Sequence, residues 1–287
     1  MTILMTGLCE KGADQIWKQC NDAMYAQGVT WLEEAAYAGD AEAWFFLGHC
    51  YSWGDGAVGF NEKKAYECYL RGASAGSARA VLGALRAGQY DEQMKQSARY
   101  SIEESYRQVR DAAEMGDVYA AWQMGEAVEW EDLADYMPQT ESAREQCLFW
   151  YERAADGGII PAMVKMGKCC QNGTYREKDE KEALRWANQC AASGEVWGLF
   201  QMGEHYRQEE DWEAAFQYDY AAAKQGSSRA MLYLGQMYLN GQGTERDIQA
   251  AVQALEGAAA RNEAESFEEL GNLFYQDELV ARGVKME

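Results

Sequence analysis

Small and apolar residues follow a series of regularly spaced glycines in this chain. Four residues after each of these glycines, which we call anchors, lies a small residue, and eight residues after it lies Leu or Met, followed by a further glycine, in six of seven units. Twelve residues after the anchor, an aromatic or apolar residue recurs in the same six units. The anchors are Gly39, Gly76, Gly116, Gly158, Gly194 and Gly226, with Asn262 in the seventh place. Their spacing of 32 to 42 residues indicates an internal structural repeat.

The spacing of four, eight and twelve residues places these side chains on one stripe of an α-helix, which we call helix A. A glycine inside a helix costs about 1 kcal/mol relative to alanine, so we expect a neighbouring helix to pack closely against each of these glycines. A turn follows, as in GDGAVGFNEKKA over residues 54–65, and then a second helical segment, helix B. Each unit is therefore predicted to be a helical hairpin, and stacking of the hairpins buries their apolar stripes.

The repeated pattern is Ala-x-x-Gly-x-x-x-Ala-x-x-x-Leu-Gly-x-x-Tyr-x-x-Gly-x-Gly, and the units anchored at Gly39, Gly158 and Gly226 match it best. This pattern resembles the Sel-one-like repeat, a relative of the tetratricopeptide repeat. The resemblance implies an all-α fold, an α-solenoid with a right-handed superhelix of about seven stacked helix-turn-helix repeats, and a bacterial source. The units at Gly76 and Gly116 lack the Gly-x-Gly turn and depart from the pattern.

The repeats predict a single repeat domain over residues 1–287. Residues 1–38 are expected to form an N-terminal capping hairpin, whose second helix begins with the capping-box spacing of Thr30-Trp31-Leu32-Glu33. Six repeats are expected over residues 39–261 and a partial C-terminal repeat over residues 262–287. The chain contains only two prolines, which leaves long stretches free of helix breakers and favours helices throughout.

The chain is strongly acidic, with 26 basic and 47 acidic residues and a formal net charge of −21. This charge repels phosphate backbones and anionic lipids, so we expect neither nucleic acid nor a membrane as a partner. No apolar run reaches 18 residues, and the N-terminal MTILMTGLCEKG lacks the basic segment of a signal peptide. A cytoplasmic location is expected. The charge either keeps a long array soluble or favours a basic partner, and both alternatives stay open.

One stretch matches a cofactor motif: residues 54–59, GDGAVG, fit the G-x-G-x-x-G of dinucleotide sites. That motif binds pyrophosphate where it follows a β-strand, whereas here it follows a predicted helix, so we interpret it as a hairpin turn and expect no cofactor. With only His49 and His205 in the chain, acid–base chemistry would depend on the acidic runs 129–135 and 209–211. We expect no catalytic and no metal-binding residues, and a carboxylate-based, metal-dependent enzyme is a remote alternative.

The eight cysteines are expected to stay reduced, as in other cytoplasmic proteins. Cys50 and Cys68 could share one hairpin, as could Cys169, Cys170 and Cys190. The resembling family includes a secreted branch in which a disulfide clamps each repeat, so disulfides remain an alternative, and a metal site is a further one.

Tetratricopeptide-like arrays bind partners on a concave face, and the resemblance implies that residues three, six, ten and thirteen positions after the anchor line it. Large aromatic side chains there are unusual on a face expected to contact water, and such side chains anchor interfaces. The candidate partner-binding residues are Phe45, His49, Tyr119, Trp122, Glu126, Glu129, Trp197, Phe200, Glu204 and Arg207. Burial of Trp122 and Phe200 against a neighbouring helix is the alternative.

These observations predict a non-enzymatic scaffold or adaptor that binds a protein or peptide segment in its concave groove. Because glutamates lie among the aromatic candidates, the expected segment is basic and partly apolar. An immunity or regulatory protein that neutralises a basic toxin or effector is a narrower alternative.

Overall fold

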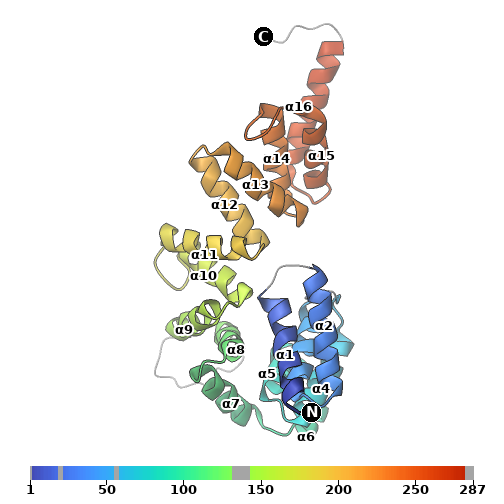
Figure 1. Cartoon of the computed structure of the whole chain (residues 1–287), viewed down its shortest axis with the longest axis vertical. Coiled ribbons are helices and arrows are strands. Elements are labelled where there is room, and N and C mark those ends of the chain that lie inside the picture. The colour runs from blue at the N-terminus through green and yellow to red at the C-terminus, as the bar shows by residue number, and fades with distance from the viewer. Residues whose placement is uncertain (1, 19–21, 55–57, 131–142, 282–287) are drawn as a thin grey trace. The chain divides into compact units, whose positions relative to one another are not determined.

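The computed structural model describes residues 2–18, 22–54, 58–130 and 143–281, and these residues contain helices and no strand, as the repeat pattern predicts (Figure 1). The first ten helices are α1 (Thr2–Trp17), α2 (Asp22–Tyr37), α3 (Ala41–Trp53), α4 (Glu62–Ala75), α5 (Ala78–Arg86), α6 (Glu92–Ser97), α7 (Ile102–Glu114), α8 (Val118–Glu129), α9 (Ala143–Asp156) and α10 (Ile160–Asn172). They are followed by α11 (Glu180–Ala192), α12 (Val196–Gln208), α13 (Trp212–Lys224), α14 (Ser228–Asn240), α15 (Ile248–Ala259) and α16 (Ala264–Ala281). None of these helices is both long enough and apolar enough to cross a membrane.

Consecutive helices pack as hairpins, which confirms the predicted units. The most extensive pairings join α3 to α4, α8 to α9, α12 to α13 and α14 to α15, each a helix A with its helix B, and α1 to α2 in the N-terminal hairpin. The second helix of that hairpin begins at Asp22, and Thr30, predicted to begin it, lies inside the helix. The second repeat differs from the others. Its helix A, α5, has only 9 residues, and the short α6 precedes α7, the helix that packs against α5. This irregularity falls where the sequence lacks the Leu-Gly pair.

The anchors have a conformation that explains their spacing. Each anchor glycine has a positive φ, between 83° for Gly194 and 103° for Gly76 and Gly116, and Asn262 has a φ of 62°. Glycine adopts this left-handed conformation without a Cβ penalty, and asparagine tolerates it better than most residues. At Gly76 the left-handed residue caps α4 and lets the chain turn into α5. The anchors therefore mark the turn from each helix B into the next helix A.

In four of the repeats the second glycine lies where a side chain of helix B packs against helix A. A Cβ added to it would lie 2.5 to 2.7 Å from that side chain, which is too close for a real contact. These contacts, which we call glycine seats, join Gly48 to Tyr69, Gly125 to Tyr151, Gly203 to Asp219 and Gly235 to Leu255. They confirm the predicted close approach of a neighbouring helix at these glycines.

At three of these seats the residue four positions further along helix A makes a second contact with the same helix B side chain, and at the fourth it lies in the same apolar cluster. Ser52 Oγ donates a hydrogen bond to Tyr69 Oη at 3.2 Å, and Tyr151 Oη donates one to Glu129 Oε2 at 2.7 Å. In the fifth repeat Arg207 forms an ion pair with Asp219, and in the sixth repeat Leu239 and Leu255 belong to one apolar cluster. The same position in the fold thus holds four different pairs.

The chain divides into two compact units, Met1–Ala183 and Leu184–Glu287, which we describe separately. In the first unit the α1–α2 hairpin packs onto α3, and Gly12 and Gly28 let α1 and α2 approach closely, since an added Cβ at either would lie 2.8 Å from the other's carbonyl oxygen. In the second unit apolar residues of α11 to α14 form one cluster, which includes Leu199, Met202 and Leu234. The single repeat domain predicted over residues 1–287 stays a prediction.

Seven of the eight cysteines lie in the described residues, and each of these seven is buried and in no disulfide. Burial raises the pKa of the Cys68 and Cys147 thiols to about 12 and that of Cys169 to about 11. The thiolate is the reactive form, so burial suppresses both oxidation and alkylation of these side chains.

We therefore expect the native protein to react slowly with a thiol reagent at pH 8. At a pKa of about 12 the thiolate fraction is roughly a thousandfold below that of a free cysteine, whose pKa is about 8.5. Unfolding in denaturant without reductant should expose all eight thiols. A titration that finds fewer than eight in the unfolded protein would instead show that some cysteines are paired.

Candidate functional site

Four of the predicted groove residues meet in the interior of the first unit. Phe45, His49, Tyr119 and Trp122 come from α3 and α8, and all four are buried. The side chain that covers them is Trp17, the last residue of α1, which is itself 2% exposed. Its ring centroid lies 5.6 Å from that of His49, 5.7 Å from that of Trp122 and 6.2 Å from that of Tyr119. We call Trp17, Phe45, Phe46, His49, Tyr119 and Trp122 the Trp17 cluster.

Polar contacts hold α1 over this cluster. Tyr119 Oη donates a hydrogen bond to Asp14 Oδ1 at 2.6 Å, and Lys18 forms an ion pair with Asp14 at 2.9 Å while its Nζ lies 5.6 Å from the Tyr119 ring centroid. Burial, followed by the bond to Asp14, raises the pKa of Tyr119 well above its ordinary value. The hydroxyl therefore stays protonated and keeps donating to Asp14.

The structure thus places His49, Tyr119 and Trp122 against Trp17, and Phe45 against His49, where the sequence predicted an open groove. Trp122 is thus buried against a neighbouring helix, which was the alternative to a position in the groove. The cause is the N-terminal hairpin, whose α1 approaches both α3 and α8 through Trp17. A partner-binding role of these four residues stays a prediction.

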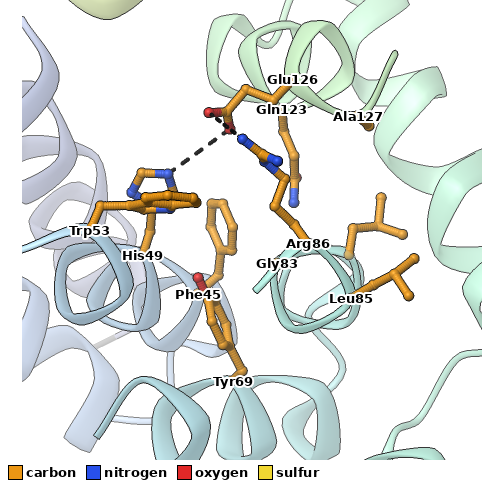
Figure 2. A pocket seen from close by; sticks show the side chains of 11 residues that line it. Phe45, His49, Trp53, Tyr69, Gly83, Leu85, Arg86, Gln123, Glu126 and Ala127 are labelled. Carbon is orange, nitrogen blue, oxygen red and sulfur yellow. Dashed lines mark ion pairs between the residues drawn. The ribbon is translucent and has the colours of Figure 1, made fainter. Parts of the chain in front are cut away.

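Glu126 lies at the edge of the Trp17 cluster, in an accessible group of charged and aromatic side chains (Figure 2). Its carboxylate is 3.8 Å from Arg86 Nη2 and 4.0 Å from His49 Nε2. The Arg86 guanidinium lies 5.3 Å from the ring centroid of Trp53 and 4.8 Å from that of Trp130. We call Trp53, Arg86, Glu126 and Trp130 the tryptophan–arginine surface.

This surface is built from the C-terminal ends of three consecutive A helices. Trp53 ends α3, Arg86 ends α5, and Trp130 follows the last residue of α8. Trp53 is 51% and Trp130 60% exposed, whereas the Arg86 side chain between them is 16% exposed. Helix C-termini carry a partial negative charge, so the rings surround a region that favours cations.

A small cavity of about 20 Å³ lies below Trp53 and Arg86, lined mostly by apolar side chains such as Phe45, Tyr69 and Leu82 (Figure 2). A volume of this size holds no more than about one water molecule. The two exposed indole rings, and not the cavity, are therefore the accessible binding features of this region.

The remaining predicted residue of the first unit, Glu129, connects three helices. It accepts a hydrogen bond from Tyr151 of α9 and forms an ion pair with Lys165 of α10. Its side chain is 14% exposed. Glu129 therefore stabilises helix packing in the structure, and its predicted role toward a partner is untested.

The other four predicted residues, Trp197, Phe200, Glu204 and Arg207, lie half-buried on α12 in the second unit. Phe200 stacks on Tyr233 of α14, with ring centroids 6.0 Å apart, and the Arg207 guanidinium lies 3.7 Å from the Tyr233 centroid. Trp197 packs beside the apolar cluster of this unit. Since their contacts are with neighbouring helices, partner binding by these residues stays a prediction.

Buried charge distinguishes this region of the second unit. Asp219 of α13 is fully buried, and its carboxylate pairs with Arg207, whose side chain is 12% exposed. Burial raises the pKa of Asp219 to about 6, although Arg207 opposes the shift and Glu204 adds to it. The Arg207–Asp219 pair is therefore a costly buried interaction that depends on both partners.

The sequence interpretation missed Trp53 and Trp130, although it contained a signal for both. Each lies fourteen residues after its anchor, Gly39 or Gly116. On a helix, this position lies only about 20° from the position three residues after the anchor, which was assigned to the groove. Extending the stripe by one turn would have identified the two tryptophans.

The residues considered for cofactor binding and for acid–base chemistry lie in turns and at helix ends. Gly54, the first residue of the dinucleotide-like motif, has a φ of 73° and caps the C-terminus of α3, while residues 55–57 lie outside the described residues. Asp211 caps the N-terminus of α13, and the run 131–135 lies outside the described residues. Within the described part of the chain, no group of three or more His, Cys, Asp or Glu side chains could hold a metal ion.

A family model described as the Sel1 repeat matches residues 23–40, 41–77, 118–159, 160–195 and 228–262. The uncharacterized protein NMB1327 of Neisseria meningitidis serogroup B is 28% identical over 174 residues, which cover 60% of this chain and 34% of that protein. The chain thus spans about a third of the length of this curated relative.

Two solved structures are similar to this chain. The protective antigen c5321 of uropathogenic Escherichia coli, described as having an SLR fold, is 20% identical with a TM-score of 0.50, over 89% of this chain and 63% of that chain. A Sel1 repeat protein from Oxalobacter formigenes is 22% identical with a TM-score of 0.46, over 94% of this chain and 86% of that chain. At this identity the likeness to c5321 concerns the fold alone.

Proposed function

Because the chain belongs to the Sel1 repeat family, whose members are generally protein-interaction scaffolds, we propose that it is a non-enzymatic scaffold that binds a protein or peptide segment at the tryptophan–arginine surface. The observation that supports this proposal is the exposure of Trp53 and Trp130 on either side of Arg86. Tryptophan and arginine are the residue types most enriched among binding hot spots, and large exposed indole rings stabilise a complex by leaving water.

The chemistry of the surface favours a basic and partly apolar segment. Glu126 and the carbonyl ends of α3, α5 and α8 attract a cation, and the indole faces bind either a cation or an apolar side chain. In the sequence, Trp130 is followed directly by Glu131 and Asp132, which add negative charge to the same part of the chain. The net charge of −21 accelerates the encounter with a basic partner.

The stacked helices supply the rigidity that such binding needs. Arg86 is already held between the two rings and Glu126, so little side-chain entropy is lost when a segment docks. A protein that neutralises a basic toxin or effector would use the same surface, and the charge supports it no more than any other basic partner.

The proposal predicts that the double variant Trp53→Ala/Trp130→Ala loses its partner while remaining folded. Each truncation should weaken binding by roughly 1–2 kcal/mol, about a five- to thirtyfold loss of affinity, because exposed rings contribute to binding and little to folding. Partners captured from native-host lysate by the wild type and by the variant are compared by mass spectrometry, at two salt concentrations. A basic partner should be lost at the higher salt.

A matched control is Met115→Ala/Phe149→Ala, which removes two similarly exposed apolar side chains from the end of α7 and from α9, both B helices. This variant should retain the partner. A protein that both double variants hold as tightly as the wild type does would place the binding site elsewhere and contradict the proposal.

A further inference from the structure

The face of α16 formed by Phe267, Gly271 and Phe274 has no helix packed on it among the described residues. Phe267 is 57% and Phe274 60% exposed, and a Cβ added to Gly271 meets nothing within 4 Å. These positions are four and three residues apart, so they form one stripe of the helix. The adjacent stripe, with Leu270 and Leu273, packs against the apolar cluster of α14 and α15.

This open stripe is equivalent to the one that binds helix B in the other repeats. Gly271 lies nine residues after Asn262, as Gly48 lies nine residues after Gly39, and Gly48 is the glycine seat for Tyr69. The same side of α8, α12 and α14 is occupied at Gly125, Gly203 and Gly235. In α16 the seat has the same sequence position and no occupant among the described residues.

The first repeat shows which side chains such an occupant presents. Trp44 and Tyr51 of α3 hold the positions that Phe267 and Phe274 hold in α16, five and twelve residues after the anchor. The guanidinium of Arg71 lies 4.9 Å from the Trp44 ring centroid, and Lys64 Nζ lies 5.0 Å from that of Tyr51. Helix α4 thus places a basic residue on each ring and Tyr69 on the glycine between them.

The charge of α16 also favours a basic helix on this face. The sequence of α16 contains five acidic residues and no Lys or Arg. The acidic residues are Glu265, Glu268, Glu269, Asp277 and Glu278. Two copies of this helix would repel each other, whereas a basic helix is attracted.

We propose that the Phe267–Gly271–Phe274 face of α16 docks an amphipathic, basic helix of another protein, in the place that helix B takes in the other repeats. The docking helix carries a large side chain for the seat at Gly271 and a Lys or Arg for each phenylalanine ring, with the spacing of Lys64, Tyr69 and Arg71. This inference is independent of the tryptophan–arginine surface, which lies in the first unit.

The test uses the chain's own helix B as probe. A fluorescent peptide of residues 61–76 with Cys68→Ala, held helical by a lactam bridge between Lys63 and Glu67, is titrated with the full-length protein and followed by anisotropy. These two bridge positions are exposed in α4 and four residues apart. Binding should weaken at least tenfold when the peptide carries Tyr69→Ala, or Lys64→Gln with Arg71→Gln.

The matching protein variant is Gly271→Leu, which fills the seat. It should weaken peptide binding at least tenfold with no loss of thermal stability, because the added side chain meets no described atom and leucine has a higher helix propensity than glycine. The control Gly7→Leu places leucine at another open helical glycine, in α1, and should bind the peptide like the wild type.

Three results would overturn the proposal. The first is equal affinity of the wild type and the Gly271→Leu variant for the peptide, and the second is no binding by the wild type up to about 1 mM. The third is a wild-type dimer, seen by analytical ultracentrifugation, that Gly271→Leu converts to a monomer, since a second copy would then be the occupant of this face.

Discussion

Replacing Trp17 by alanine will lower the free energy of unfolding by about 3–5 kcal/mol, the usual cost of truncating a fully buried tryptophan. Trp17 is 2% exposed and contacts rings from two other helices, Phe46 of α3 and Trp122 of α8, at centroid distances of 5.2 and 5.7 Å. Its removal leaves a cavity between hairpins that are far apart in the sequence. Those hairpins cannot close it by a local shift, because close helix contacts fix each backbone, at Gly12 and Gly28 in the N-terminal hairpin and at the glycine seats of α3 and α8.

Denaturant unfolding, followed by circular dichroism, measures this loss. Trp17→Phe should cost clearly less than Trp17→Ala, because the ring contacts are partly kept. Trp53→Ala should change the free energy of unfolding by less than about 1 kcal/mol, because Trp53 is largely exposed. If Trp17→Ala unfolds like the wild type, Trp17 is a displaceable cover on an accessible groove, and the groove predicted from the sequence regains its support.

Replacing Arg207 by alanine will have a similarly large effect, about 3–5 kcal/mol at pH 8, because it leaves the fully buried carboxylate of Asp219 without its partner. The double variant Arg207→Leu/Asp219→Leu should be far less destabilised. It introduces the pair that the sixth repeat holds at the same place, Leu239 and Leu255, and buried ion pairs are often replaced by apolar pairs at little cost. A double variant no more stable than Arg207→Ala would contradict this explanation.

The same pair makes stability depend on pH. In the native protein the pKa of Asp219 is about 6, above the ordinary value of about 3.9 expected after unfolding, so the native state binds the proton more tightly. Stability from this group is present at low pH and is lost as pH rises through 6. Relative to the Leu–Leu variant, the wild type should lose about 1 kcal/mol between pH 5.5 and pH 8. If the wild type instead gains stability relative to the Leu–Leu variant over this pH range, Arg207 lowers the pKa of Asp219 more than burial raises it.

The features that could be predicted from the sequence are those that depend on spacing within one repeat. The A helices, the anchors and the close approach at Gly48 or Gly235 all follow from positions a few residues apart. The structure adds that an anchor such as Gly116 is left-handed, which explains why glycine recurs there.

The candidate site could be predicted only in part, because it depends on contacts between repeats. How closely α1 approaches α8 depends on how successive hairpins pack on one another, which no single repeat encodes, so the burial of Tyr119 and Trp122 under Trp17 was not predictable. Arg207 was assigned to a groove from its position on helix A, yet its partner, Asp219, is a helix B residue outside the repeat pattern. Glu126 lies beside Arg86 and His49 at the edge of the Trp17 cluster, and its partner-binding role stays a prediction.

The variety of the glycine seats has a consequence for how the gene can evolve. Recombination between similar repeats would exchange one helix A for another. The helix A residue beside each glycine seat would then lose its partner on helix B. With α8 in the place of α12, the glutamate equivalent to Glu129 would lie against Asp219, and two carboxylates would share one buried position. The lineage can therefore lengthen this array by duplicating whole hairpins, whereas crossovers between the two helices of a hairpin yield chains that fold poorly.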